Sequence, residues 1–223
     1  MGLAEKLKIR PGITAVIGGG GKTTLLRTLG EELAKRNRVL LCTSTKIMPF
    51  PGVPCAKGEA ELKRLRSGNS RLICAGRELP DTGKLAAPEI PFPQMAEWFD
   101  YVLAEADGSA QRPLKAHAPH EPVIPPEADQ TICVVGASGF GRPIAEAVHR
   151  PELFARLAGA SLQEAVTAEM EAAVLKAEAL HQRVYINQVE TLPDLMEAKT
   201  LAALLDCPVL AGSLQRGEYF QCW

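Results

Sequence analysis

Apolar and polar residues follow two different patterns along this chain. Short runs rich in Val, Ile and Leu are typical of buried strands, and apolar residues spaced three or four apart are typical of amphipathic helices. The runs predict strands over 13–18, 38–43, 71–76, 101–107, 131–138, 183–188 and 208–213. The spaced residues predict helices over 22–36, 58–68, 94–100, 150–159, 161–182 and 192–205. Because the two kinds of element alternate, the expected fold is α/β, with helices flanking a doubly wound, mostly parallel sheet. We expect one domain over 1–223, with a small hairpin insertion over 72–87.

The stretch "AVIGGGGKTT", Ala15–Thr24, lies between the first predicted strand and the first predicted helix. Glycines let backbone amides approach phosphate oxygens closely, and the N-terminus of a helix adds partial positive charge. A lysine and a threonine at the start of such a helix reach the β- and γ-phosphates and a magnesium ion. The competing interpretation is a glycine-rich turn without a ligand. The predicted residues of an ATP or GTP site are Gly18, Gly19, Gly20, Gly21, Lys22, Thr23 and Thr24.

Two carboxylates end the predicted strand "YVLAEAD". In P-loop enzymes an acidic residue at the end of a buried strand holds magnesium directly or through water. Glu105 and Asp107 stand two residues apart, so both project from one face if the strand stays extended. We expect magnesium at Thr23, Glu105 and Asp107. The expected catalytic groups, which stabilise phosphoryl charge or orient water, are Lys22, Asp107 and Thr45 of "CTSTKI". An acidic turn and strand-end capping explain the same residues without a ligand.

The stretch "YINQVE" ends a later predicted strand. Many GTPases carry Asn-Lys-x-Asp at such a place, where the Asn and Asp contact the guanine edge. Asn187 and Glu190 correspond to these two positions in residue type. The sequence therefore predicts that both contact the nucleobase, and it leaves open a contact with adenine or a plain hydrogen-bonding turn.

The segment 112–129 has prolines at positions 113, 119, 122, 125 and 126, so neither a helix nor an inner strand can continue through it. A long irregular segment inside a domain is often functional. Polar residues in this segment and in "AVHRPE" are expected to contact a second substrate or a partner. A surface position or a helix start explains them equally well. These residues are Arg112, Lys115, His120, Glu121, His149 and Arg150.

Composition excludes several classes of function. The net charge of -1 provides no long-range attraction to nucleic acid or to an anionic membrane. No apolar run approaches the length of a membrane span, and the N-terminus lacks an apolar signal core, so we expect a cytoplasmic protein. The six cysteines are too scattered for a sequence-local zinc or iron–sulfur motif. They are interpreted as small buried side chains in a reducing compartment.

Together, "GGGGKTT", "TSTKI", "EADGSAQRPLKAHAPHEPVIP", "VHRPE" and "YINQVE" resemble the YqeC family, accessory proteins of selenium-dependent molybdenum hydroxylases. The resemblance runs over nearly the whole chain and is most specific in the "EADGS…PLKA…HEPVIP" block. The loop also resembles the K-G-G-x-G-K-T-T loop of the SIMIBI class of P-loop NTPases, with Ile17 in place of the lysine that reaches across a dimer. The resemblance implies a P-loop NTPase fold, Mg²⁺ with a nucleoside triphosphate, a molybdenum hydroxylase client and a homodimer among the expected assemblies.

Three functional hypotheses are consistent with these residues. The leading one is magnesium-dependent binding and hydrolysis of ATP or GTP, coupled to maturation or cofactor insertion of a selenium-dependent molybdenum hydroxylase. One alternative is a P-loop small-molecule kinase, which transfers the phosphoryl group only when its acceptor is bound. The other is a nucleotide-gated chaperone or switch with little intrinsic hydrolysis. The sequence leaves the base, the client and the oligomeric state undecided.

Overall fold

The computed structural model describes residues 1–222. The chain forms two compact units whose segments alternate along the sequence. The first unit consists of 1–16, 23–107 and 123–130, and the second contains 17–22, 108–122 and the chain from 131 onward. Each unit combines mostly parallel strands with helices, which confirms the predicted α/β class. The expectation of a single domain stays a prediction.

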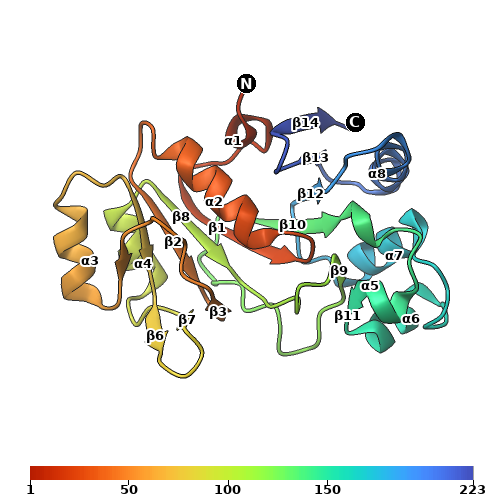
Figure 1. Ribbon diagram of the computed structural model, residues 1–223, viewed down its shortest axis with the longest axis horizontal. Coiled ribbons are helices and arrows are strands. Elements are labelled where there is room, and N and C mark those ends of the chain that lie inside the picture. The colour runs from red at the N-terminus through yellow and green to blue at the C-terminus, as the bar shows by residue number, and fades with distance from the viewer. Residues whose placement is uncertain (223) are drawn as a thin grey trace. The chain divides into compact units, whose positions relative to one another are not determined.

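The first unit contains a parallel sheet with the strand order β1–β8–β2–β5–β4, of which Figure 1 labels β1, β8 and β2. Parallel neighbours cannot be joined by tight turns, so helices connect them. The strands are β1 (Gly12–Gly18), β2 (Val39–Thr43), β4 (Cys55–Ala56), β5 (Leu72–Ala75) and β8 (Tyr101–Glu105). The helices are α1 (Leu3–Lys6), α2 (Lys22–Leu33), α3 (Glu59–Arg66) and α4 (Phe92–Trp98).

Helices cover both faces of this sheet. On one face, Leu62 of α3 and Met95 of α4 join a core cluster with strand residues that include Ile13, Leu40, Ile73 and Val102. On the other face, a Cβ added to Gly30 of α2 would lie 2.9 Å from side-chain atoms of Leu41 and Leu72. Glycine therefore lets α2 lie directly on β2 and β5. Three of the leucines whose spacing predicted this helix, Leu25, Leu26 and Leu29, are fully buried.

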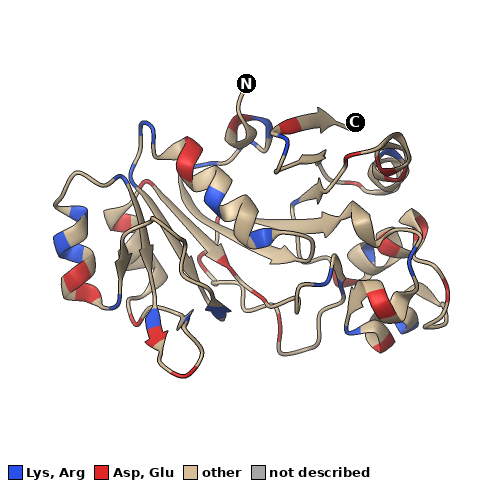
Figure 2. Ribbon diagram, viewed as in Figure 1, with Lys and Arg blue, Asp and Glu red and all other residues tan. Residues whose placement is uncertain are grey.

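The charges on α3 are ordered along the helix. Acidic residues occupy its first turn and basic residues its last turn, as Figure 2 shows. This order is favourable because the helix dipole is positive at its N-terminus and negative at its C-terminus. The helix is held by its charges and by Leu62 rather than by a side-chain cap, because its N-cap residue is Gly58.

The predicted hairpin insertion is present but shorter than 72–87. It consists of β6 (Arg77–Leu79) and β7 (Lys84–Ala86), and β3 (Lys46–Ile47) pairs with β7 to complete a three-stranded antiparallel sheet. Leu72–Ala75 lies outside the hairpin because this segment pairs with β2 as strand β5.

The second unit contains a sheet with the order β14–β13–β12–β10, in which only β14 is antiparallel to its neighbour. Its strands are β10 (Gln130–Gly136), β12 (Arg183–Asn187), β13 (Val209–Ser213) and β14 (Glu218–Gln221), and β9 (Leu114–Lys115) pairs separately with β11 (Val148–His149). Its helices are the 3₁₀ turn η1 (Ala137–Gly139), α5 (Ile144–Ala147), α6 (Pro151–Ala158), α7 (Ala168–Glu178) and α8 (Leu192–Leu204). Within residues 1–222, no helix combines the length and the apolar character that a membrane span requires.

One secondary-structure prediction for this unit was wrong, and one strand was missed. The helix expected over 161–182 is shortened to α7, because Thr167 caps its N-terminus by accepting a hydrogen bond from the Met170 amide. The preceding segment instead pairs its backbone with residues 141–145. Strand β14 was not predicted, because its four residues gain their pairing only from β13.

Tyr185 on β12 is fully buried, and its hydroxyl has no hydrogen-bond partner within residues 1–222. A buried polar group without a partner costs about 1–3 kcal/mol. We therefore expect Tyr185→Phe to raise the free energy of unfolding by about 1 kcal/mol, measured by urea denaturation.

The matched control is Tyr101→Phe, at a partly exposed tyrosine where β8 begins. Its free energy of unfolding should change by less than about 0.5 kcal/mol. A clear loss of stability in Tyr185→Phe would show that the hydroxyl has a partner and would contradict the prediction.

Candidate functional site

The glycine loop, residues 17–22, joins β1 to α2 and belongs to the second unit. The Gly19 amide donates to the Val134 carbonyl at 2.9 Å, and the Gly20 amide donates to the Arg112 carbonyl at 3.2 Å. The protein itself therefore uses two of the amides that the sequence assigned to phosphate.

Close packing explains why these positions are glycines. A Cβ on Gly18 would lie 2.3 Å from the Val134 carbonyl oxygen, and a Cβ on Gly20 would lie 2.4 Å from the Gly136 backbone. Gly18, Gly20 and Gly21 also have positive φ angles of 95°, 70° and 116°, which other residues rarely adopt. The shape of the loop thus depends on glycine for steric reasons that are independent of any ligand.

Asn187, the last residue of β12, holds the loop through both ends of its amide. Its Nδ2 donates to the Gly20 carbonyl at 2.7 Å, and its Oδ1 accepts from the Leu214 amide at 3.1 Å. The residue is only 6% exposed, so it acts as a fixed brace between the loop and the end of β13. Its predicted contact with a nucleobase stays a prediction.

Glu190, the other residue expected at the nucleobase, also contacts the protein. Its Oε1 accepts a hydrogen bond from the Ser213 hydroxyl at 2.9 Å, and Nη2 of Arg216 lies 3.6 Å from its Oε2. These contacts tie the segment after β12 to the segment after β13. Contact between Glu190 and a base stays a prediction as well.

Lys22 lies across the glycine loop. Its Nζ donates to the Gly18 carbonyl at 2.6 Å, and the residue is 4% exposed. A buried ammonium group needs such oxygen partners because burial removes its water. The bond holds the positive charge over the loop, at the place where the sequence expects phosphate.

In the first unit, Thr23 meets the acidic end of β8. The Thr23 hydroxyl donates to Oε2 of Glu105 at 2.7 Å, although the two residues are 82 positions apart in the sequence. Glu105 is 7% exposed, and Asp107 two residues later is fully buried. The structure thus brings together two of the three residues that the sequence predicted for magnesium.

Thr45 is linked to the same strand end through Thr43. The Thr43 hydroxyl donates to the Glu105 carbonyl at 2.7 Å and accepts from the Thr45 amide at 3.0 Å. The two threonine hydroxyls lie 3.3 Å apart. Thr43 is absent from the predicted site residues, although it ends β2 and pairs in register with Glu105. The signal that identifies Thr43 is a hydroxyl-bearing residue at the last position of a strand, beside the acidic end of a neighbouring strand.

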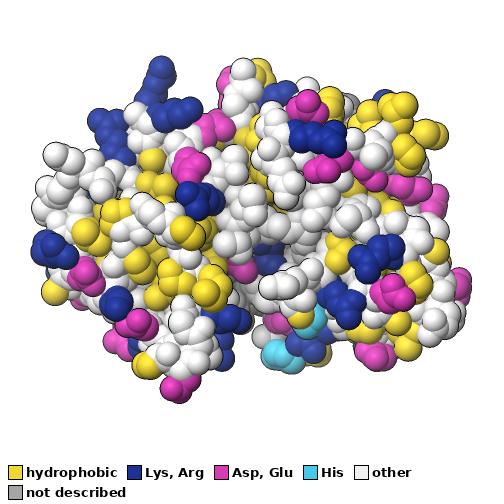
Figure 3. Space-filling model, viewed as in Figure 1, with side chains coloured by type: hydrophobic (Ala, Val, Ile, Leu, Met, Phe, Trp, Pro, Cys, Tyr) yellow, Lys and Arg dark blue, Asp and Glu magenta, His cyan; other side chains and the backbone are white. Residues whose placement is uncertain are grey.

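Four residues predicted to contact a second substrate form one network in the second unit. Lys115 has a fully buried side chain, and its Nζ donates to Oε2 of Glu121 at 2.9 Å and to the Gly108 carbonyl. Arg150 pairs with the other carboxylate oxygen, and its Nη2 lies 3.3 Å from Nε2 of His120. Figure 3 shows histidine side chains beside basic side chains on one face of the molecule.

This network has an electrostatic consequence for Glu121. Burial acts to raise the pKa of Glu121, but the hydrogen bonds from Arg150 and Lys115 outweigh it and lower that pKa to about 2. His149 and Lys115 pair in register on β11 and β9, and Arg112 contacts the glycine loop through its carbonyl. The charged side chains of Lys115, Glu121 and Arg150 therefore pair with one another, and binding of a second substrate stays a prediction.

Comparisons with known proteins connect this geometry to a family. The family model described as "YqeC protein" matches residues 14–152, more than half of the chain. The matched residues include the glycine loop, Glu105, Glu121 and Arg150, but neither Asn187 nor Glu190.

Two individual proteins are also similar. The YqeC protein of Escherichia coli (strain K12) is 38% identical over 160 residues, which cover 67% of this chain and 62% of that protein, less than two thirds of its length. The signal recognition particle 54 kDa protein of Aeropyrum pernix K1, solved in complex with GDP, matches with a TM-score of 0.42 and 16% identity. That match covers 95% of this chain and 43% of the other. On the family model and the resemblance of its motifs, the chain belongs to the YqeC protein family.

Proposed function

We propose that this chain binds ATP or GTP with Mg²⁺ at the glycine loop, and that hydrolysis drives maturation or cofactor insertion of a selenium-dependent molybdenum hydroxylase. The observation that carries the nucleotide site is the 2.7 Å hydrogen bond between Thr23 and Glu105. P-loop enzymes use a threonine after the loop lysine and an acidic strand end to hold magnesium. The role in hydroxylase maturation rests on the family resemblance.

The contacts of the loop indicate which part of it meets the phosphates. The amides of Gly19 and Gly20 already donate to backbone carbonyls, so we assign phosphate binding to residues 21–24, which comprise the end of the loop and the first residues of α2. These residues form the N-terminus of α2, where the helix dipole favours negative charge. Lys22 adds a full positive charge at the same place.

The residues around Glu105 fit a magnesium ion. A hydroxyl and a carboxylate are hard oxygen donors, which suit Mg²⁺ better than a soft metal. No group of three or more His, Cys, Asp and Glu in residues 1–222 could hold a metal by itself. Mg²⁺ is often bound through one or two protein oxygens, with substrate phosphates and water completing its shell. When bound, the ion would neutralise charge on the β- and γ-phosphates.

The remaining groups have roles in hydrolysis in this proposal. Lys22 stabilises the charge that develops on the transferring phosphoryl group. Thr45, held through Thr43 on the Glu105 carbonyl, or the buried Asp107 orients the attacking water.

A nucleotide-gated switch is the second candidate function, and one contact favours it. Gly108 directly follows Asp107, and its carbonyl accepts from the buried Lys115, which Glu121 holds. A change in the backbone at Asp107 on nucleotide binding would therefore reach the surface through Glu121 and Arg150.

Measurement of phosphate release distinguishes the two functions. Repeated turnover by the isolated chain supports the hydrolase, and one slow turnover supports the switch.

We expect Lys22→Met to weaken binding of fluorescent ATP and GTP analogues about 10- to 100-fold, the value of one hydrogen bond to a charged group. Methionine keeps an unbranched apolar stem and removes the ammonium group, together with its hydrogen bond to the Gly18 carbonyl. Fluorescence titration measures the dissociation constants. Circular dichroism and the thermal unfolding midpoint establish that the variant is folded. Undiminished binding of both analogues by the folded variant would contradict the nucleotide site.

Thr23→Val should abolish the gain in nucleotide affinity that Mg²⁺ provides, because it removes the hydroxyl but keeps the shape of the side chain. The measurement is a titration of each analogue with Mg²⁺ and with EDTA. Thr28→Val is the matched control, since Thr28 lies farther along the same helix and its hydroxyl donates to the Thr24 carbonyl. An equal Mg²⁺ dependence in Thr23→Val and the wild type would rule out Thr23 as a magnesium ligand.

A further inference from the structure

Two cysteines that are distant in the sequence lie opposite each other in the first unit. Cys55 on the edge strand β4 pairs in register with Cys74 on β5, and their Sγ atoms are 3.6 Å apart. Neighbouring strands lie about 4.8 Å apart, and disulfides join residues whose Cα atoms are roughly 4.4–6.8 Å apart. The usual spacing of neighbouring strands therefore falls within the range that disulfides span, and the two sulfurs already lie close to each other.

The two thiols differ in exposure and in acidity. Cys55 is partly exposed, whereas Cys74 is fully buried. The hydrogen bond between them lowers the pKa of Cys55, and the same bond together with burial raises the pKa of Cys74. The thiolate is the reactive form of cysteine. Cys55 is therefore suited to the first attack. Cys74 is suited to the second by position, because its sulfur lies 3.6 Å away and the hydrogen bond that raises its pKa is lost once the Cys55 thiol has become a mixed disulfide.

We propose that Cys55 and Cys74 form a thiol–disulfide exchange site for low-molecular-weight disulfides. The Cys55 thiolate attacks one sulfur of the small disulfide, breaks its S–S bond and releases one thiol. Cys74 then gives up its proton and attacks the Cys55 sulfur of the mixed disulfide, which releases the second thiol. The protein loses two hydrogen atoms and gains one S–S bond, while the small disulfide is reduced to two thiols.

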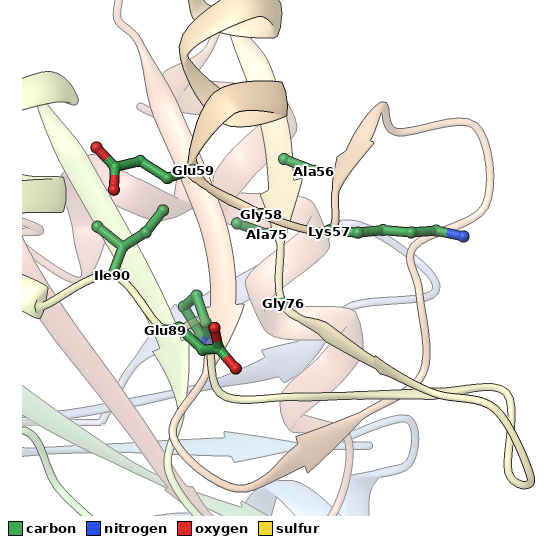
Figure 4. Close-up of a pocket in the computed structure, with 9 residues that line it drawn as sticks. Ala56, Lys57, Gly58, Glu59, Ala75, Gly76, Glu89 and Ile90 are labelled. Atoms are coloured by element: carbon green, nitrogen blue, oxygen red, sulfur yellow. The ribbon is translucent and has the colours of Figure 1, made fainter.

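Oxidation of the two cysteines to a disulfide would hold the edge strand β4 in place next to a cavity. Ala56 and Ala75, which follow the two cysteines, line a cavity of about 240 Å³, from which Lys57 extends away (Figure 4). Successive strand residues point to opposite faces, so the cysteines lie on the other face of the same two strands. A disulfide would tie the two-residue strand β4 to β5 and so hold together two strands that line the cavity.

The test is oxidation of the full-length folded protein with glutathione disulfide, followed by trypsin digestion without reductant and mass spectrometry. Cleavage after Lys46, Lys57, Arg71 and Arg77 places Cys55 in peptide 47–57 and Cys74 in peptide 72–77. We expect these peptides to appear as one cross-linked species that lacks two hydrogen atoms. The number of thiols titrated after denaturation should fall from six to four. A dithiol reductant should restore all of them.

Single variants separate the two steps of the exchange. Cys74→Ser should retain one glutathione on Cys55, and Cys55→Ser should leave Cys74 as a free thiol. Cys222→Ser is the control, because Cys222 is also partly exposed but burial raises its pKa. This variant should form the cross-link as the wild type does. A wild type that stops at a Cys55–glutathione adduct, or in which Cys207 and Cys222 react while Cys55 stays reduced, would overturn the proposal.

Discussion

The hydrogen bond between Thr23 and Glu105 connects the start of α2 to the end of β8, and the candidate site depends on it. Lys22 and Thr23 are consecutive, so the residue that lies over the glycine loop is one peptide bond from the residue that contacts the acidic strand end. Hydrogen bonds to carboxylates are roughly twice as strong as neutral ones. The carbonyl of Glu105 also holds Thr43, and through it Thr45. One strand end therefore organises three hydroxyl groups from two other segments.

The glycine loop serves two purposes at once. Its first half is packed so tightly against Val134 and Gly136 that any side chain would collide with the backbone. Its second half begins a helix whose amides are directed along the helix axis. The brace from Asn187 fixes the boundary between the halves at Gly20. A loop that is rigid before a ligand arrives loses less conformational entropy on binding, which favours a phosphate site.

The sequence predicts local features well and tertiary contacts poorly. Strand β1, the glycine loop and α2 follow from residue spacing, because neighbouring residues determine them. The pairing of Cys55 with Cys74 requires two strands to pair in register, and the spacing of residues in the sequence does not predict it. The same holds for Asn187, whose residue type indicates base recognition but whose amide contacts a loop 167 residues away. Lys115, Glu121 and Arg150 were expected together, but the two ion pairs that Glu121 makes with the other two residues are tertiary contacts that residue spacing does not predict.

A double-mutant cycle on Thr23 and Glu105 tests the central claim most directly. The quantity is the Mg²⁺-dependent part of the nucleotide binding free energy in the wild type, Thr23→Val, Glu105→Gln and the double variant. If the two side chains hold one magnesium ion, the losses are not additive, and the double variant binds no worse than the weaker single variant. Additive losses would contradict the account, and so would an unchanged Mg²⁺ dependence in all three variants.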